Sequence, residues 1–360
     1  MNSPSTPVTP SRLRYCSQPA QRPREFDPEV TAGRASAIIT FSKKFVAGTD
    51  LSYYCYERGD GSPDRWHGKP DDIAAVVAAF GEWQSLGIGL SFKRVGRAED
   101  AMVRIGFDAD DGSWSYVGRD ALGLRDPGER TMNFGWPLTT PYGRDTALHE
   151  IGHAVGLEHE HQNPFAGIVW DEQAVREYFR GPPNHWDDDE IHRNILRKVP
   201  RTSVKGTTWD PDSVMEYEFE PGLIKEPPQF FQTGLKPRGG LSGFDKSWIC
   251  EAYPRPPAQL PQLEVSISQK LGIGKGETRL FEFRPQRTRT YCIGTFGTSD
   301  TVLVLFEVTP GGNVQIGGDD DGGQDRNALV SMRLTAGRVY QVGLRLFYAD
   351  LPAETSLMVW

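Results

Sequence analysis

The sequence has few cysteines, no long apolar run and no excess of basic residues. Its 360 residues include only four cysteines. These are too scattered for a zinc site made of cysteines and too few for a disulfide framework, although one disulfide is possible. No stretch approaches the roughly 18 apolar residues of a membrane span. The net charge of −8 argues against a nucleic-acid-binding protein, which normally presents a basic face.

The beginning of the chain also lacks the apolar segment of an ordinary signal peptide. Residues 1–30 are rich in Pro, Ser and Arg, a composition typical of a disordered or loosely draped arm. A stretch with four prolines in nine residues, 254–262, is typical of a stiff linker. The sequence therefore predicts an N-terminal arm at 1–34, a first domain at 35–255, a linker at 256–262 and a second domain at 263–360.

The first domain alternates between strand-like and helical patterns. Its first half predicts a strand at 49–57, a helix at 71–87, strands at 88–95, 101–107 and 130–136, and a helix at 144–156 that Gly156 ends. Helices are also expected at 171–179, 187–198 and 243–253. This order predicts an α+β domain, a twisted mixed sheet with an active-site helix.

The second domain consists of short strand-like runs separated by Gly, Pro and Asp. The first of these runs is LEVSIS, 263–268, and the last is TSLMVW, 355–360. Eight such runs predict an all-β sandwich.

The stretch HEIGHAVGLEHEH, 149–161, holds four of the seven histidines. His149 and His153 are four residues apart, so a helix presents both on one face, where neutral imidazoles can bind one zinc ion. Catalytic zinc sites usually have three protein ligands. Gly156 tolerates a sharp turn, and His159 then completes the string H-E-x-x-H-x-x-G-x-x-H. His161 falls outside the string and is expected at the surface or beside the ligands.

The extended string resembles that of the metzincin zinc endopeptidases. Downstream, Ser213-Val214-Met215-Glu216-Tyr217 resembles the methionine turn of the astacin branch, in which the tyrosine also reaches the zinc or the oxyanion. For Met215 and Tyr217 alone, ordinary core packing is the alternative. Glu160 matches the astacin glutamate that follows the third histidine. Glu216 departs from the histidine common in that turn, and most of the astacin cysteine framework is missing. The resemblance, astacin-like or matrixin-like, spans about 43–254.

The resemblance implies a zinc-dependent endopeptidase. Zn²⁺ would be held by His149, His153 and His159, Glu150 would be the general base, and Tyr217 would donate a hydrogen bond to the oxyanion. Residues 113–117 precede the helix and are expected either to pair with extended substrate or to be a plain edge strand. The partners would be protein or peptide substrates, and the enzyme would be a monomer. By resemblance the protein would be secreted and extracellular, with a cytoplasmic location as the alternative.

Residues 263–360 resemble the bacterial pre-peptidase C-terminal domain, a β-sandwich found after secreted peptidases. This resemblance rests on FGTSDTVLVLFE and on the segment that begins GGDDDGGQD. Asp319, Asp320, Asp321 and Asp325 could bind Ca²⁺, with a solvated hairpin turn as the alternative. A non-catalytic adhesion or binding protein that uses this sandwich is the alternative function.

Two further predictions concern cysteines. Both Cys55 and Cys250 lie on elements that frame the domain in the resembling fold, which implies a disulfide between them. Cys16 lies in the arm, and a thiolate is a strong zinc ligand. An arm across the cleft would place Cys16 at the fourth zinc position, as latent matrixin-like enzymes do, with Arg12 and Arg14 pairing with cleft carboxylates. The alternative is an idle thiol in a disordered tail.

Overall fold

A computed structural model describes residues 14–19, 43–45, 47–124, 126–199, 208–255, 259–274, 277–309, 312–347 and 352–360. The first domain is built on a five-stranded sheet of order β2-β1-β3-β5-β4. Its strands are β1 (Asp50–Cys55), β2 (Ser91–Arg94), β3 (Val103–Gly106), β4 (Trp114–Ser115) and β5 (Met132–Asn133). All pairings are parallel except β4 with β5. The predicted mixed sheet is therefore confirmed, and β4 lies at its edge.

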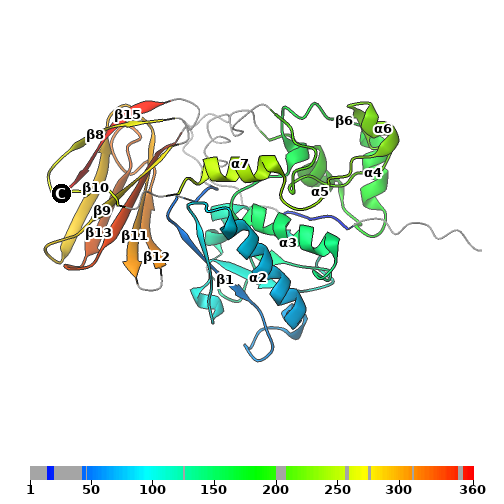
Figure 1. Cartoon of the computed structure of the whole chain (residues 1–360), viewed down its shortest axis with the longest axis horizontal. Helices are drawn as coiled ribbons and strands as arrows, with labels where there is room; N and C mark the ends of the chain where they lie inside the picture. Colours follow the sequence, from blue (N-terminus) through cyan, green and yellow to red (C-terminus); the bar gives the residue numbers. More distant parts are fainter. Residues whose placement is uncertain are drawn as a thin grey trace, which may run out of the picture.

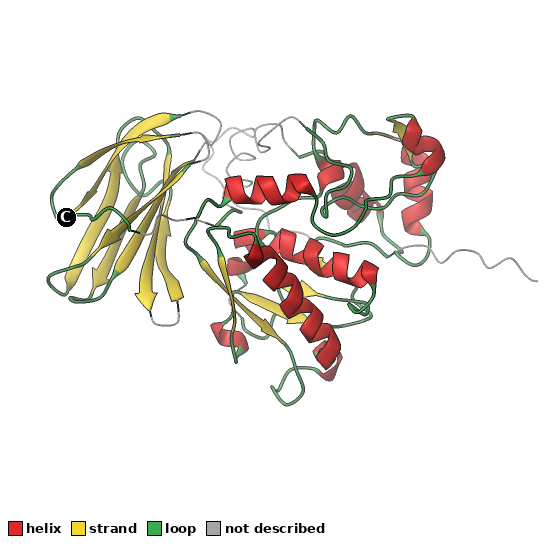
Figure 2. Cartoon of the chain, in the orientation of Figure 1, coloured by secondary structure: helices red, strands yellow, loops and turns green. Residues whose placement is uncertain are grey.

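Two long helices pack together beside this sheet (Figures 1 and 2). They are α2 (Pro70–Ser85) and α3 (Pro141–Ala154). Four of the five apolar residues expected on the buried face of α2, Ile73, Val76, Phe80 and Trp83, are buried, whereas the fifth, Val77, is exposed. Thr140 caps α3 by accepting a hydrogen bond from the Gly143 amide. Each helix has a proline in its first turn, where no intrahelical hydrogen bond is lost.

The buried residues of the first domain form two main clusters. The upper core joins the sheet, α2, α3, the methionine turn and α7 (Gly243–Ala252), and Trp83 and Phe80 lie at its centre. We call the second, smaller cluster the lower core. Apart from the residues of the arm, its side chains follow α3 in the sequence. It contains side chains of α4 (Glu172–Arg180), α5 (Asp188–Ile191) and the segment 217–224, together with Tyr15 and Cys16 from the arm. The arm is therefore part of the domain's packing at these two residues.

The lower half of the first domain contains short elements joined by long loops. They are β6 (Val169–Trp170), a π-helical turn (His192–Leu196), β7 (Ile224–Glu226) and α6 (Gln229–Thr233), in addition to α4 and α5. Short 3₁₀ turns lie at Asp64–Trp66, Ala98–Asp100, Gly118–Gly123 and Glu160–Gln162.

The C-terminal region is a sandwich of two four-stranded sheets, as predicted. The sheet orders are β13-β10-β15-β8 and β12-β11-β14-β9. The strands are β8 (Gln269–Ile273), β9 (Thr278–Phe283), β10 (Arg289–Phe296), β11 (Thr301–Thr309), β12 (Gly312–Asp319), β13 (Leu329–Leu334), β14 (Tyr340–Leu346) and β15 (Ala353–Val359). The strand expected at 263–268 is wrong. That segment makes only an isolated bridge at Val265, and the first strand begins at Gln269.

The sandwich contacts the sheet of the first domain where β1 begins. The Asn313 side chain donates a hydrogen bond to the Gly48 carbonyl (3.0 Å), and its amide bonds to Asp50. Figure 1 shows the sandwich beside β1 and one end of α7.

The predicted disulfide is corrected, whereas the calcium site in the acidic loop stays a prediction. The Cys55–Cys250 disulfide is not formed: both thiols are free, Cys55 is buried in β1, and Cys250 is exposed on α7. In the acidic loop, Asp319 accepts hydrogen bonds from the amides of Gly322 and Leu329, as in a hairpin turn. None of the loop's aspartates belongs to a metal-binding group among the described residues. Within the same residues, no helix is long and apolar enough to cross a membrane.

Candidate metal centre and cleft

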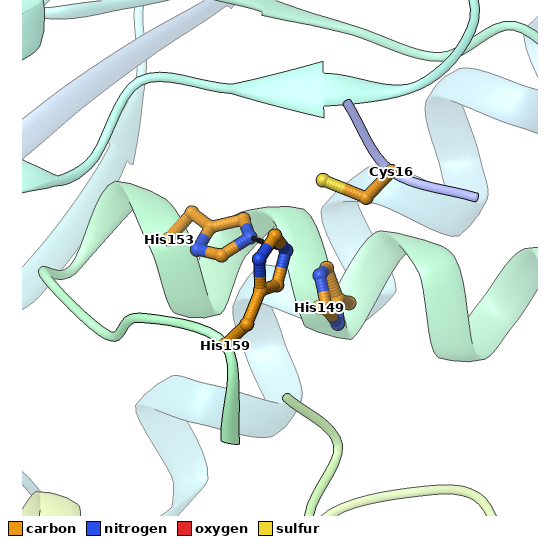
Figure 3. A group of neighbouring side chains, drawn as sticks. All are labelled: Cys16, His149, His153 and His159. Carbon is orange, nitrogen blue, oxygen red and sulfur yellow. Dashed lines mark hydrogen bonds between the residues drawn. The ribbon is translucent and has the colours of Figure 1, made fainter. Parts of the chain in front are cut away.

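Four side chains from three segments meet above the C-terminal half of α3. These are His149 and His153 of α3, His159 after the turn, and Cys16 of the arm (Figure 3). Their ligand atoms all lie within 4.8 Å of one another, and all four residues are buried. Three imidazoles and one thiol are a donor set that suits tetrahedral zinc. His161 does not join this group.

Hydrogen bonds orient the imidazoles toward the centre of the group. His149 Nδ1 lies 2.8 Å from the Val214 carbonyl, and His153 Nδ1 lies 2.8 Å from the Leu157 carbonyl. A carbonyl only accepts, so each Nδ1 carries the proton and each Nε2 has a free lone pair. His149 Nε2 is buried without a hydrogen-bond partner among the described residues, and His153 Nε2 and His159 Nε2 face each other at 3.0 Å. A metal ion between these nitrogens fits as the missing partner.

Burial keeps the histidines neutral. It lowers the pKa of His153 to about 4 and holds the pKa of His149 and His159 well below the ordinary value. Neutral imidazole is the form that binds metals, so these side chains need not lose a proton to do so.

Two glycines allow the local geometry. Gly156 has φ +99°, which turns the chain after α3 and brings His159 back to the helix. Gly152 lies on the helix face above Met215, and a Cβ at that position would clash with the Met215 sulfur. The methionine turn therefore packs directly beneath the helix that carries the two histidines.

The methionine turn is held by an aspartate that the sequence analysis missed. Asp245 of α7 accepts hydrogen bonds from the Ser213 hydroxyl (2.7 Å) and the Val214 amide (2.8 Å). It also forms a capping box with Ser242. The S-x-x-D pattern at 242–245 is a recognisable sign of a helix start, but nothing in it points to the methionine turn.

Glu150 lies beside Cys16 and the histidines. It is fully buried, and burial raises its pKa to about 8. Its Oε2 accepts a hydrogen bond from the Cys16 thiol (3.5 Å), whereas Oε1 has no partner among the described residues. A carboxyl group with a pKa near neutrality is suited to accept and return a proton.

Tyr217 reaches the same centre from the methionine turn. Its hydroxyl lies 2.9 Å from His159 Nε2 and donates to the Cys16 carbonyl at 2.7 Å. Burial raises the pKa of Tyr217 well above the ordinary value, so this side chain remains a hydrogen-bond donor.

His161 is buried behind His159 rather than exposed. Its ring stacks on that of His159 with centroids 5.2 Å apart, and its Nε2 lies 2.8 Å from the Asn194 carbonyl. Its Nδ1 lies 3.4 Å from Glu216, which takes the place of the usual histidine of the turn. The surface location is therefore wrong, and the location beside the ligands is confirmed.

The arm lies along the edge of the sheet. Cys16 forms a parallel bridge with Ser113, and the Ser17 amide donates to the Ser113 carbonyl (3.0 Å). Gln18 places its side-chain amide 3.3 Å from His153 Nδ1. Arg14 donates to the Gly135 carbonyl (3.5 Å) rather than to a carboxylate, and Arg12 lies outside the described residues. Residues 14–19 are therefore not part of a disordered tail, since the Cys16 thiol is buried in the site, and the latch stays a prediction.

The comparisons with known proteins agree with this geometry. The model of the astacin family of peptidases matches residues 67–177. The structure of myroilysin superposes with a TM-score of 0.53 at 29% identity, covering 61% of this chain and 98% of that one. No curated protein matches the chain.

Two further solved structures resemble parts of the chain. The zinc-protease hatching enzyme HCE-1 of the medaka fish Oryzias latipes has a TM-score of 0.36 at 16% identity, covering 58% of this chain and 91% of that one. The pre-peptidase C-terminal domain of the Bacillus anthracis collagenase has a TM-score of 0.25 at 14% identity, covering 29% and 99%.

A mixed sheet over a helix with this histidine string, closed below by a methionine turn, defines a zinc metalloendopeptidase of the metzincin type. More particularly, the chain resembles the astacin family of metzincins over residues 67–177, and a β-sandwich follows this domain. Its substrates are proteins or peptides.

Proposed function

We propose that His149, His153 and His159 hold the zinc ion of this peptidase and that Glu150 is its general base. The single observation that supports this most is the buried group of ligand atoms within 4.8 Å of one another. When bound there, zinc supplies a water of lowered pKa and polarises the scissile carbonyl. Glu150 takes the proton of the attacking water and passes it to the leaving amine.

Tyr217 has a separate role in this proposal. Its hydroxyl already donates to a main-chain carbonyl at the centre, that of Cys16. A substrate carbonyl in the same place gains negative charge in the transition state, which strengthens the hydrogen bond. The neighbouring edge strand supplies the Ser113 carbonyl to hold the peptide main chain, as it holds Ser17.

Cys16 keeps the enzyme latent in the form described. Its sulfur occupies one position of the four-ligand group, and its hydrogen bond uses the Glu150 carboxylate. Burial raises the pKa of the Cys16 thiol, whereas a cation in the group would favour the thiolate, and the thiol proton would then pass to Glu150, which already accepts it in a hydrogen bond. A sulfur ligand would take the position of the catalytic water, and the arm takes the edge strand that would hold the substrate. Activity then requires displacement of the arm.

We also keep the predicted domain limits and propose a monomer that acts outside the cell. The alternative, a non-catalytic binding protein, is not favoured, because histidines, glutamate and tyrosine form a complete site.

Metal analysis of matched variants tests the ligand assignment. Wild type is expected to hold about one zinc per chain and, after treatment with a thiol reagent, to cleave casein. His159→Ala should lose both properties, while His161→Ala should keep the zinc despite its buried place. Equal zinc loss in the two variants would refute the assignment of His159.

A further inference from the structure

The arm inserts one aromatic side chain beside the metal centre. Tyr15 is 5% exposed, and its ring packs among aromatic side chains of the lower core. We name the cavity that it fills the Tyr15 pocket; its walls are Tyr178, Phe179, Trp186, Tyr217 and Phe219. The nearest wall is Phe179, with ring centroids 4.9 Å apart, and Phe219 stacks at 6.3 Å.

The end of the pocket is polar and matches a phenol. The Tyr15 hydroxyl donates to the Glu218 carbonyl at 2.7 Å and lies 3.5 Å from the Tyr178 hydroxyl. At the mouth of the pocket, the main-chain amide of Tyr15 donates a hydrogen bond to the Asn184 side chain (3.2 Å), which holds the main chain of the arm there. Apolar walls with an acceptor at the far end bind a tyrosine side chain better than phenylalanine, whose ring leaves that acceptor without a partner.

The pocket is in register with the reacting groups. The residue after Tyr15 places its carbonyl on the Tyr217 hydroxyl, and the next one pairs with the edge strand at Ser113. The arm thus occupies the edge strand and the Tyr217 hydroxyl, the two contacts that the proposed function gives to a peptide substrate. A side chain one residue from the carbonyl that Tyr217 contacts falls into the Tyr15 pocket.

The pocket adjoins a small cleft beside the metal centre. This cleft of about 70 Å³ is lined by Tyr15, Glu150 and Tyr217 and also by Trp136 and Tyr142. The walls of the pocket belong to the lower core and the methionine turn, not to the arm. Departure of the arm would therefore leave the walls in place, and one of them, Tyr217, borders the cleft directly.

We propose that the Tyr15 pocket is the side-chain subsite that selects substrates, and that it takes an aromatic residue flanking the scissile bond, tyrosine before phenylalanine. This rests on the proposed peptidase function. In the latent form the arm fills the subsite with its own tyrosine.

A binding experiment tests the pocket without any catalysis. Full-length Tyr15→Ala leaves the walls intact and removes the occupant. N-acetyl-L-tyrosinamide should bind this variant with a dissociation constant on the order of 1 mM, by NMR saturation transfer. N-acetyl-L-alaninamide should not bind, and neither compound should bind wild type. Equal binding of the tyrosine compound to both proteins, or to neither, would overturn the proposal.

A cleavage experiment tests selection. The full-length double variant Tyr15→Ala/Cys16→Ser removes both holds of the arm. Matched peptides that differ only at the residues flanking the scissile bond should be cleaved about ten- to hundredfold faster with tyrosine than with alanine at one of these positions. Cleavage without such a preference would refute the subsite while leaving the peptidase function intact. If no peptide is cleaved but the tyrosine compound binds, the peptidase assignment fails and the pocket remains.

One further pair of variants connects the selection to the pocket. Adding Tyr178→Phe to the double variant should lower the tyrosine-to-phenylalanine rate ratio about two- to fivefold. The control is Tyr56→Phe, which likewise removes the hydroxyl of a buried tyrosine, but in the upper half, where this hydroxyl donates to the Pro127 carbonyl. An equal change of this rate ratio in the two variants would show that the preference for tyrosine does not arise in the Tyr15 pocket.

Discussion

The upper and lower cores of the first domain differ in how much they depend on the arm. Among the described residues, the upper core contains none before Phe45, and its largest side chain, Trp83, comes from α2. The lower core includes Tyr15 and Cys16, and five of its aromatic side chains surround Tyr15. The metal centre lies between the two. The upper half therefore packs without the described part of the arm, whereas the lower half needs Tyr15 and Cys16 of the arm to complete its core.

This difference indicates that the upper core positions most of the reacting groups, whereas the arm and the lower core control access to them. His149, Glu150 and His153 are fixed on α3, which the upper core holds. The arm and the Tyr15 pocket belong to the lower core, and so does Tyr217, although its hydroxyl acts on the reacting carbonyl. Variants of α3 and of Tyr217 should change the rate of the chemical step, whereas variants of the arm should change access and selectivity.

The largest effect is expected for Glu150→Gln. An amide cannot accept the water proton, so casein hydrolysis by thiol-activated enzyme should fall at least about 10²-fold. Zinc content should stay near one per chain. Glu82→Gln, at a partly exposed position of α2 that pairs with Arg144, is the matched control and should keep full activity. Near wild-type hydrolysis by Glu150→Gln would exclude this side chain as the base.

Tyr217→Phe should come second. Removing one donor to the oxyanion typically costs about 10²-fold in kcat. The loss should appear in kcat far more than in KM, because the hydrogen bond strengthens in the transition state. Steady-state kinetics on a single peptide separates the two constants. An unchanged kcat would leave Tyr217 as a wall of the Tyr15 pocket only.

The upper half could be predicted from the sequence to a larger extent than the lower half, for a physical reason. The spacing of the histidine string is local, because one helix and one turn fix the relative positions of His149, His153 and His159. The apolar period of α2 is local too. Such patterns need no knowledge of distant residues.

The lower half depends on contacts between distant residues. Tyr15 and the Glu218 carbonyl are 203 residues apart, and no period in the sequence connects them. The same holds for Asp245 and the methionine turn. His161 illustrates the limit in another way, since its spacing excluded it as a ligand correctly but gave no sign of its burial against Glu216. The missed start of β8 arose because LEVSIS alternates like a strand yet lacks a continuous neighbour.

The variant Cys16→Ser tests whether the arm keeps the enzyme latent through the Cys16 thiol. Without a thiolate the arm keeps only Tyr15 and its main-chain contacts, so peptide cleavage should rise at least about tenfold over the untreated wild type. A thiol-modifying reagent should activate wild type and leave Cys16→Ser unchanged. Cys250→Ser is the control, because that exposed thiol is far from the site. If Cys16→Ser and the reagent both leave cleavage unaltered, the arm is not a latch.

The smallest effect is expected for Tyr15→Ala, and its matched partner is Tyr53→Ala. Both tyrosines are 5% exposed, but Tyr53 stacks on Phe80 in the upper core, with ring centroids 4.0 Å apart. Truncating a large side chain there should lower the free energy of unfolding of the domain by about 3–5 kcal/mol. At position 15 the arm can leave and water can enter the pocket, so the loss should stay local.

Hydrogen exchange distinguishes these two outcomes for the paired variants. In Tyr15→Ala, amides of 172–196 and 217–224 should exchange faster, while those of β1, β3 and α2 keep the protection of the wild type. In Tyr53→Ala, all these amides should lose protection together, because the upper core carries the whole domain. Faster exchange throughout the domain in Tyr15→Ala would show that the arm supports both cores equally. The proposed difference between an upper core that packs without the arm and a lower core that depends on it would then be wrong.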